Sequence, residues 1–510
     1  MKFTDTRTGV ENDLTFTDVV VKGIAPSGGL FVPTHIPSMT DEDIRALADM
    51  PYGKQAATVF KHFGIDVDDA TIDEAMCEAY GSQWSDERIV PVTTLREGVH
   101  ILELFHGPTS AFKDLALQCM PRFMSISLAQ LYQKQVFNQD MLILVATSGD
   151  TGKAALDGFA DRAHTSIVVF YPEEGVSDLQ KMQMATQMGD NVAVFGVRGN
   201  FDDCQSAVKA AFADDTFNDW LGAHAKMKLS SANSINWGRL MPQIVYYLSA
   251  CARLWIDGKL AEGQLLDISV PTGNFGNILA AWYAKQMGAP IGRLICASNS
   301  NNILADFLRT GIYDISDRSF FTTPSPSMDI LISSNLERLL YHLAGAEKTA
   351  LWMEQLKTKE SFEVDDDTFD LLQETFVGGW IGDDESLDRI FRCWKKHHYL
   401  IDPHTAVGLD IALLEQGDNP ILVVSTAHWA KFAPSVLRAL LGVSFDDEMP
   451  EPYTSHSGFE TLDDVIARAP GCSPIPEAIE ALRDEQPRFK EVIDADPEAI
   501  KQVIKAFVAD

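Results

Sequence analysis

Through the middle of the chain, short apolar runs rich in β-branched residues alternate with longer stretches of helical periodicity. An apolar run of about four to eight residues between turn residues is typical of a strand that is buried on both faces. Helical stretches such as 177–189 and 202–213 separate several of these runs. The order predicts βαβ units, and therefore an α/β fold with mainly parallel sheets that carry helices on both faces. The predicted strands lie at residues 141–147, 166–172, 191–197, 265–273, 294–299 and 421–427.

The two ends of the chain have a different character. The first 95 residues are rich in turn signals, as in Ala25–Pro33, and then carry acidic amphipathic helices. After Leu441, proline and acidic residues recur, which is typical of peripheral helices. Because 510 residues are too many for one ordinary core, we expect several parts. These are an N-terminal α/β extension (1–95), a core of two open α/β domains (96–440, the smaller at about 125–230 inserted in the larger), and a C-terminal helical segment (441–510).

The charge balance restricts the possible partners. The chain has 41 basic and 73 acidic residues, which give a net charge of −32. Such a surface repels nucleic acid and anionic membranes, so we expect neither as a partner. A small anionic ligand would need a local group of basic side chains, because the overall field opposes its binding.

The cysteine pattern and the N-terminal sequence indicate a cellular location. The seven cysteines are scattered singly, with neither a disulfide framework nor the spacing of a zinc site. The N-terminus lacks the apolar segment of a signal peptide, and the apolar run at 141–146 is too short to cross a membrane. We therefore expect a cytoplasmic protein without a bound metal.

The junction at 267–288 combines a predicted strand, a glycine-containing loop and a helix that starts near Asn277. Gly273 and Gly276 permit backbone conformations that other residues avoid. Backbone N–H groups of the loop and of the helix N-terminus can then bind a phosphate. Glycines are also common in ordinary strand-to-helix turns, so the residues alone leave both readings open.

A second junction, at 144–160, places hydroxyl groups and glycines before an alanine-rich helix. This arrangement suits an anion, although Ser148 or Asp150 could instead cap the helix. A nucleotide P-loop is excluded because Lys153 follows the last glycine and precedes Ala154. A third junction presents polar side chains at the end of the strand 421–427. Ligands of open α/β sheets bind at such carboxyl ends, and a phosphorylated cofactor with an anionic amino acid would satisfy all three junctions.

Six motifs in one order carry a resemblance to a known family: HGPTSAFKD, TSGDTG, SANSIN, PTGNFGN, MDILISSNLER and TAHWAKF. The sequence resembles the threonine synthases, which are fold type II enzymes dependent on pyridoxal 5′-phosphate (PLP). The segments GLFVP and FDDCQSAVKAAF are similar to the longer form of this family, and the resemblance extends to about Gly442. The chain departs from the family at Trp429, where proline is frequent, and at Asn277, where bacterial members often have aspartate.

The resemblance implies a role for particular residues. Lys113 would bind PLP covalently as a Schiff base, and Thr426 would offer its hydroxyl to the pyridine nitrogen. The phosphate of the cofactor would lie on Gly273, Asn274, Phe275, Gly276 and Asn277. The carboxylate of the substrate would lie on Thr147, Ser148, Gly149, Asp150 and Thr151, and its phosphate on Asn233, Ser234 and Arg239.

Each of these roles has an ordinary structural alternative. A lysine taken at random lies at the surface, and an arginine near the start of a helix often forms only a weak surface ion pair. His106 and His428 lie in the motifs, but we assign them a structural role because position alone does not establish proton transfer.

The resemblance implies the conversion of O-phospho-L-homoserine and water to L-threonine and phosphate, the last step of threonine biosynthesis. A related PLP enzyme, such as a threonine dehydratase or a phospholyase, would share Lys113 and the cofactor loop but would not need the cradle at 233–239. A non-catalytic protein that binds a phosphorylated ligand would have no use for Lys113.

Overall fold

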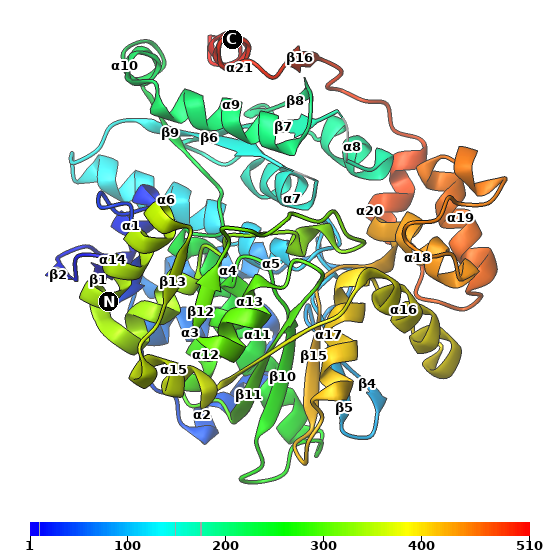
Figure 1. Ribbon diagram of the computed structural model, residues 1–510. Coiled ribbons are helices and arrows are strands. Elements are labelled where there is room, and N and C mark those ends of the chain that lie inside the picture. Colours follow the sequence, from blue (N-terminus) through cyan, green and yellow to red (C-terminus); the bar gives the residue numbers. More distant parts are fainter. Residues whose placement is uncertain (10, 148, 174–175, 510) are drawn as a thin grey trace.

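Two open sheets form the body of the molecule, one above the other in the view of Figure 1. The computed structural model describes residues 1–9, 11–147, 149–173 and 176–509. All six predicted apolar runs are strands of these sheets. The predicted α/β class, with two open and mainly parallel sheets, is therefore confirmed.

The larger sheet has the strand order β14-β11-β10-β15-β5-β4. All neighbours are parallel except β4 and β5, which form an antiparallel pair at one edge. The central strands β10 and β15 are buried along their whole length, which explains their continuous apolar character. The strands are β4 (Val92–Arg96), β5 (Val99–Glu103), β10 (Leu266–Pro271), β11 (Ile291–Ser298), β14 (Phe376–Trp380) and β15 (Ile421–Ser425).

The smaller sheet has the order β16-β8-β7-β6-β9, and all its strands are parallel. Its edge strand β16 comes from the C-terminal segment, so that segment is not purely helical. In Figure 1 this last part of the chain lies beside the upper sheet, far from the strands that precede it in sequence. The strands are β6 (Asp140–Ala146), β7 (Thr165–Pro172), β8 (Val192–Arg198), β9 (Met227–Ser230) and β16 (Val492–Asp494).

The N-terminal residues share a core with the rest of the chain. A small antiparallel sheet, β2-β1-β3, and helices α1 to α4 make up this part. Phe3 packs edge-on against Trp237 at 5.5 Å between ring centroids, and Phe16 packs in the same way on Phe60 and Phe123. The N-terminal part is therefore attached by buried aromatic contacts to α6 (Met120–Gln133) and α11 (Trp237–Ile256). These strands are β1 (Phe3–Asp5), β2 (Glu11–Asn12) and β3 (Phe31–Pro33), and β12 (Ile312–Asp314) pairs with β13 (Ser361–Glu363) elsewhere.

Helices cover both faces of the two mainly parallel sheets, and α11 is buried over most of its length between α12 and the N-terminal helices. In the part of the chain that the structure describes, no helix combines the length and apolar character needed to span a bilayer. The helices of the first half are α1 (Phe16–Lys22), α2 (Asp41–Ala46), α3 (Tyr52–Phe63), α4 (Asp69–Ala79), α5 (Lys113–Leu117), α6 (Met120–Gln133), α7 (Asp150–Phe159), α8 (Asp178–Ala185), α9 (Phe201–Ala213), α10 (Asp215–His224) and α11 (Trp237–Ile256). Those of the second half are α12 (Gly276–Gln286), α13 (Ile303–Thr310), α14 (Leu336–Lys359), α15 (Asp366–Gln373), α16 (Asp383–His397), α17 (Pro403–Leu414), α18 (Ala433–Leu441), α19 (Gly458–Arg468), α20 (Glu477–Glu480) and α21 (Pro497–Phe507).

Candidate active site

The segment that leads to Lys113 runs along the residues that follow β15. The backbone N–H of Phe112 donates to the carbonyl of Thr426 at 2.8 Å, and that of His428 donates to the carbonyl of Ser110 at 3.1 Å. These contacts place two sequence motifs, separated by some three hundred positions, side by side. Lys113 is the first residue of α5 and therefore lies at the carboxyl edge of the larger sheet.

The side chain of Lys113 is buried and close to two polar groups. It is only 13% exposed, and its Nζ lies 3.3 Å from Ser327 Oγ and 3.8 Å from Asp150 Oδ2. Burial lowers the pKa of Lys113 to about 8; the Asp150 carboxylate opposes this shift, and the nearby Lys431 and Arg239 cations add to it. The reading of Lys113 as a surface lysine is therefore wrong. Its amine loses a proton more easily than that of an ordinary lysine, as a nucleophile requires.

Asp150 is the first residue of α7 and lies within the predicted carboxylate cradle. Its Oδ1 is 3.0 Å from Lys431 Nζ and accepts a hydrogen bond from Gln180 at 3.1 Å. Burial alone would raise the pKa of Asp150, but the Lys431 and Lys113 cations hold it below its usual value. The helix is capped by Gly149 without a side-chain hydrogen bond, so Asp150 is not a cap.

The loop before α7 is held by its own threonine. Thr147 Oγ1 accepts hydrogen bonds from the backbone N–H groups of Gly149 (3.0 Å) and Gly152 (2.9 Å). Gly149 has a φ of +136°, and a Cβ there would lie 2.6 Å from the Gln180 side chain, so glycine is required. The oxygen of Thr147 thus shapes the loop. Thr151 follows in the first turn of α7, and the predicted Ser148 lies outside the described residues.

The loop between β10 and α12 has the form expected of a phosphate site. Phe275 adopts the left-handed conformation with a φ of +61°, and α12 begins at Gly276. The N–H of Leu279 donates to the carbonyl of Phe275, so the N–H groups of residues 276–278 precede the first turn of helical hydrogen bonds. A Cβ on Gly273 would lie 2.8 Å from the Ser327 carbonyl, which places this loop against the residue that contacts Lys113.

Asn277 is buried at the start of α12. Its Oδ1 accepts hydrogen bonds of 2.5 Å from the hydroxyls of Tyr246 and Tyr247 on α11. Its Nδ2 is also buried and has no partner among the described residues. A buried amide donor without an acceptor is costly, so this atom is suited to an oxygen that a ligand supplies.

Arg239 lies in the first turn of α11 and is 4% exposed. Its Nη1 donates to the carbonyl of Ala232 at 2.5 Å, whereas its buried Nε lacks a partner within the described parts of the chain. Burial lowers the pKa of Arg239 to about 10, and the described residues offer it no ion pair. The alternative of a surface ion pair is therefore wrong. Ser234 is half-buried and Asn233 is exposed, at the outer end of the same loop.

Thr426 lies directly after β15 and is buried. Within the described chain its hydroxyl has no hydrogen-bond partner, so it is available to a ligand at this sheet edge. The two histidines of the motifs are both bound to protein groups. His106 Nε2 lies 2.8 Å from a carboxylate oxygen of Glu103. His428 Nδ1 accepts from the N–H of Ala430, and burial lowers the pKa of His428 to about 3. These contacts agree with structural roles.

Comparison with known proteins assigns the family. Residues 2–80 match the family described as Threonine synthase N terminus, residues 89–426 match Pyridoxal-phosphate dependent enzyme, and residues 405–504 match Threonine synthase, C-terminal. The Threonine synthase of Schizosaccharomyces pombe is 36% identical over 474 residues, which cover 87% of this chain and 90% of that protein. The chain belongs to the threonine synthase family. The family match continues well past Gly442, where the quoted motifs end.

Other members of the family show how far the similarity extends. Threonine synthase-like 1 of Homo sapiens is 42% identical over 437 residues, which cover 83% of this chain and 58% of that longer protein. A crystal structure of PLP-bound threonine synthase from Brucella melitensis has a TM-score of 0.85 and 34% identity, and the match covers 100% of both chains. The fold is accordingly that of the fold type II PLP enzymes, and PLP is the cofactor of this family.

The residues present fit this cofactor. Three groups lie at the same sheet edge: a buried amine, a helix start with free N–H groups, and a buried hydroxyl. They suit, in that order, the aldehyde, the phosphate and the ring nitrogen of PLP. The unpartnered Nδ2 of Asn277 is a further donor beside the phosphate loop. Because Asn277 is neutral, it can donate where an aspartate would add negative charge.

Several residues around this site could not be recognised from the sequence. Ser327 links Lys113 to Asp150, and its backbone N–H donates to His404 Nε2 at 3.2 Å. Since Nε2 accepts this bond, the Nδ1–H of His404 donates to the Asp402 carboxylate at 2.6 Å. Lys431, which contacts Asp150, was also missed; it lies in the quoted motif TAHWAKF, where a lysine among mainly apolar residues was the available signal.

The MDILISSNLER motif holds the predicted cofactor phosphate loop in place by hydrogen bonds. Asn335 donates from its backbone and its side chain to the carbonyl of Asn274, at 3.1 and 2.9 Å. The buried Arg338 donates to the Asn335 side chain, to the carbonyl of Phe31 in β3, and to that of Ile235 before α11. The N-terminal part of the chain is thereby connected to both predicted phosphate sites.

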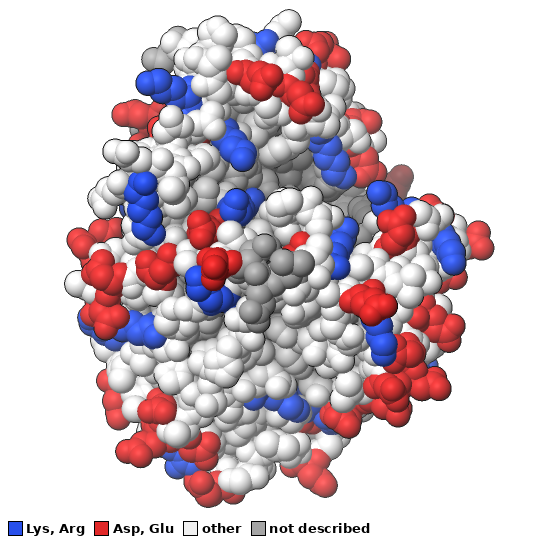
Figure 2. Space-filling model, turned by 90° about the vertical axis from the view of Figure 1, so that its left-hand side faces the viewer, with Lys and Arg blue, Asp and Glu red and all other residues white. Residues whose placement is uncertain are grey.

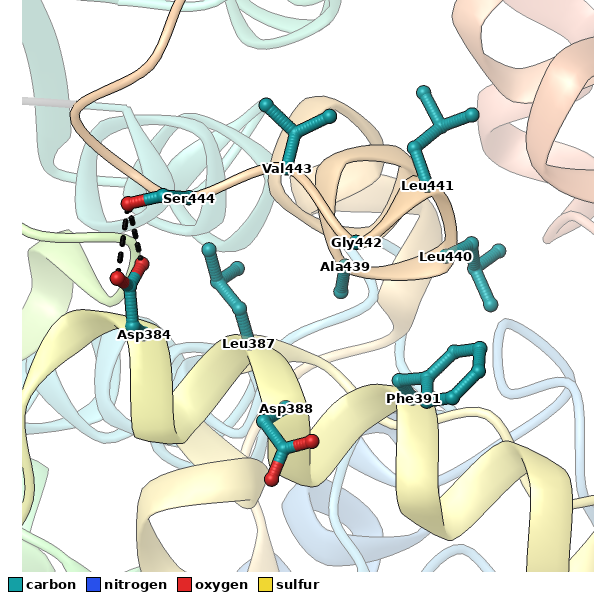
Figure 3. Close-up of a pocket in the computed structure, with 10 residues that line it drawn as sticks. All are labelled: Asp384, Leu387, Asp388, Phe391, Ala439, Leu440, Leu441, Gly442, Val443 and Ser444. Atoms are coloured by element: carbon teal, nitrogen blue, oxygen red, sulfur yellow. Dashed lines mark hydrogen bonds between the residues drawn. The ribbon is translucent and has the colours of Figure 1, made fainter.

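Two surface features lie outside this site. Acidic side chains are spread over the face shown in Figure 2, with Lys and Arg between them. A hollow of about 450 Å³ lies between α16 and the end of α18, where Ser444 donates to the Asp384 carboxylate (Figure 3). None of the residues around this hollow is a predicted site residue.

Proposed function

We propose that the chain is a threonine synthase that converts O-phospho-L-homoserine and water to L-threonine and phosphate, the last step of threonine biosynthesis. The observation that carries the choice of substrate is Arg239, a buried guanidinium without a carboxylate partner in the described chain. A buried charge without a counter-ion is unfavourable unless a ligand supplies that ion. Membership of the threonine synthase family supports the same reaction.

We assign the cofactor to the residues at the edge of the larger sheet. Lys113 would hold PLP covalently, residues 273–277 would bind its phosphate, and Thr426 would hydrogen bond to its ring nitrogen. The bound cofactor supplies an electron sink that stabilises negative charge on the substrate carbons. The neutral hydroxyl of Thr426 is a weaker partner for the ring than a carboxylate, so it would not impose a proton on the nitrogen.

The substrate would be held at both ends. Residues 147–151 would bind its carboxylate through the N–H groups before α7, and Asn233, Ser234 and Arg239 would bind its phosphate. Lys113 would move protons between Cα, Cβ and Cγ, because an amine with a pKa near 8 gains and loses protons at neutral pH. Loss of phosphate from Cγ and addition of water at Cβ complete the change. We also propose a cytoplasmic location, with domain divisions near residues 95 and 440.

The test is to incubate the purified, PLP-loaded protein with O-phospho-L-homoserine and to identify the organic product and the phosphate released. We expect L-threonine and phosphate in equal amounts. A keto acid with ammonia would identify a dehydratase or phospholyase instead, and the absence of any turnover would favour a protein that only binds the ligand. The Lys113→Ala variant is the control for reaction without the enzyme's own amine.

A further inference from the structure

Lys431 is a lysine with no access to solvent. Its side chain is 0% exposed, and it lies in the short turn Trp429–Phe432 that follows β15. Its Nζ donates to the carbonyl of Thr109 at 2.7 Å and lies 3.0 Å from Asp150 Oδ1. Lysine is rarely buried in full, and a buried ammonium is retained only with close partners. The partners of Lys431 are the loop before Lys113 and the carboxylate beside it.

Two amines share the Asp150 carboxylate, but not equally. Oδ1 faces Lys431 at 3.0 Å, and Oδ2 faces Lys113 at the longer distance of 3.8 Å. Ser327 Oγ lies 3.3 Å from both Oδ2 and the Lys113 Nζ, so it stands between them. The tighter ion pair is therefore the one with Lys431.

This division has a chemical consequence. A carboxylate beside an amine stabilises its protonated form, and a protonated lysine cannot bond to an aldehyde. A second cation on the same carboxylate reduces that stabilisation. Resting on the proposed function, we propose that Lys431 is a positioning residue that takes up the charge of Asp150 and thereby leaves the amine of Lys113 free to bond to the cofactor.

The other charged groups near Lys113 do not perform this task. Arg239 and Asp114 act on it with opposite signs, and Asp114 accepts hydrogen bonds from the backbone and hydroxyl of Thr109. His404, which pairs with Asp402, is a further titratable neighbour that acts on Asp150. Lys431 is the cation in direct contact with the carboxylate that faces Lys113. The same pairing also offsets the negative charge with which Asp150 would repel a substrate carboxylate.

The experiment is a pH titration of the absorbance of the lysine-bound cofactor in the holoenzyme. In Lys431→Met the full charge of Asp150 acts on the Lys113 nitrogen, so the midpoint should rise by about one pH unit or more. In Asp150→Asn the stabilising carboxylate is lost and Lys431 remains, so the midpoint should fall. General damage to the site has no reason to move the midpoint in opposite directions.

Lys153 offers a matched control. It is another largely buried lysine, on α7, but it lies 3.7 Å from Asp157 and does not contact Asp150. Lys153→Met should leave the midpoint where it is in the wild type, and Lys431→Arg should restore it toward that value because the charge returns. If Lys431→Met fails to fold, Lys431→Gln tests the same expectation, because it removes the charge and keeps a donor for the Thr109 carbonyl.

The outcomes separate this proposal from the proposed function. A midpoint that does not move in Lys431→Met, or that rises in Asp150→Asn, would overturn the role of Lys431 while PLP binding at Lys113 stands. A wild-type protein without the absorbance of lysine-bound PLP would instead overturn the proposed function itself.

Discussion

Replacement of Arg239 by methionine is the most direct test of the substrate assignment. Methionine keeps much of the length and volume of the side chain and removes only its charge and donors. A hydrogen bond to a charged group contributes about 1.5–3 kcal/mol. Since about 1.4 kcal/mol corresponds to a factor of ten, kcat/KM for O-phospho-L-homoserine should fall by about 10- to 150-fold.

The structure adds a second expectation for the same variant. In the free protein the Arg239 charge is buried with one backbone carbonyl as its partner and with an unpartnered Nε. Its removal therefore relieves a desolvation cost while it leaves one carbonyl unpaired, and these effects oppose each other. We expect the thermal unfolding temperature to change little, although the side chain is nearly inaccessible. Activity should be lost without a comparable loss of stability.

Steady-state kinetics, thermal unfolding and cofactor content are the measurements. Arg122 provides the control because it is also a buried arginine but donates to the carbonyls of Gln118 and Glu78, neither of which is a predicted site residue. Arg122→Met should lower the unfolding temperature and spare kcat/KM. If kcat/KM were unchanged in Arg239→Met, the substrate phosphate would have to bind elsewhere. If PLP were lost, Arg239 would belong to the site of the cofactor phosphate and not to that of the substrate phosphate.

Three further variants test other parts of the site. Lys113→Ala should lack the lysine-bound cofactor, and an absorption band still reducible by borohydride would refute the assignment. Thr426→Val removes one hydrogen bond, worth about 1 kcal/mol, so turnover should fall while PLP stays bound; lost PLP with normal activity per bound cofactor would contradict this role. Arg338→Met breaks three hydrogen bonds and should cost about 2–4 kcal/mol of unfolding free energy in urea; a cost below about 1 kcal/mol would show that these bonds do not connect the N-terminal part to the site.

The six central strands could be predicted because each is a continuous apolar run, and parallel strands buried on both faces require this pattern. Strand β16 could not be predicted in the same way. It has three residues, and it pairs with β8, about three hundred positions earlier in the chain. So short a run carries no periodicity of its own, and only the tertiary pairing makes it a strand. The segment after Leu441 therefore looked purely helical.

In the site, too, residues required by the local backbone could be predicted, whereas residues brought in by the fold could not. The glycines of the two helix-start loops are visible in sequence because the backbone conformation at Gly149 and the close approach at Gly273 both demand them. Ser327 and His404 lie in no quoted motif and reach Lys113 only through the fold. The burial of Arg239 was likewise invisible, since an arginine in the first turn of a helix looks the same in sequence whether it is exposed or not.

The local charge at this site is opposite to that of the whole molecule. Lys113 and Lys431 share the carboxylate of Asp150, and the Arg239 cation acts on Lys113 from nearby, whereas the chain as a whole carries a net charge of −32. The excess of buried cations favours ligands with several negative charges, and PLP with a phosphorylated amino acid supplies them. The acidic surface in turn repels polyanions in general. An anion that binds must therefore gain more free energy from the buried cations than it loses by repulsion as it approaches the surface. Raising the salt concentration should therefore weaken the repulsion at the surface more than the attraction within the site, because buried charges are screened less.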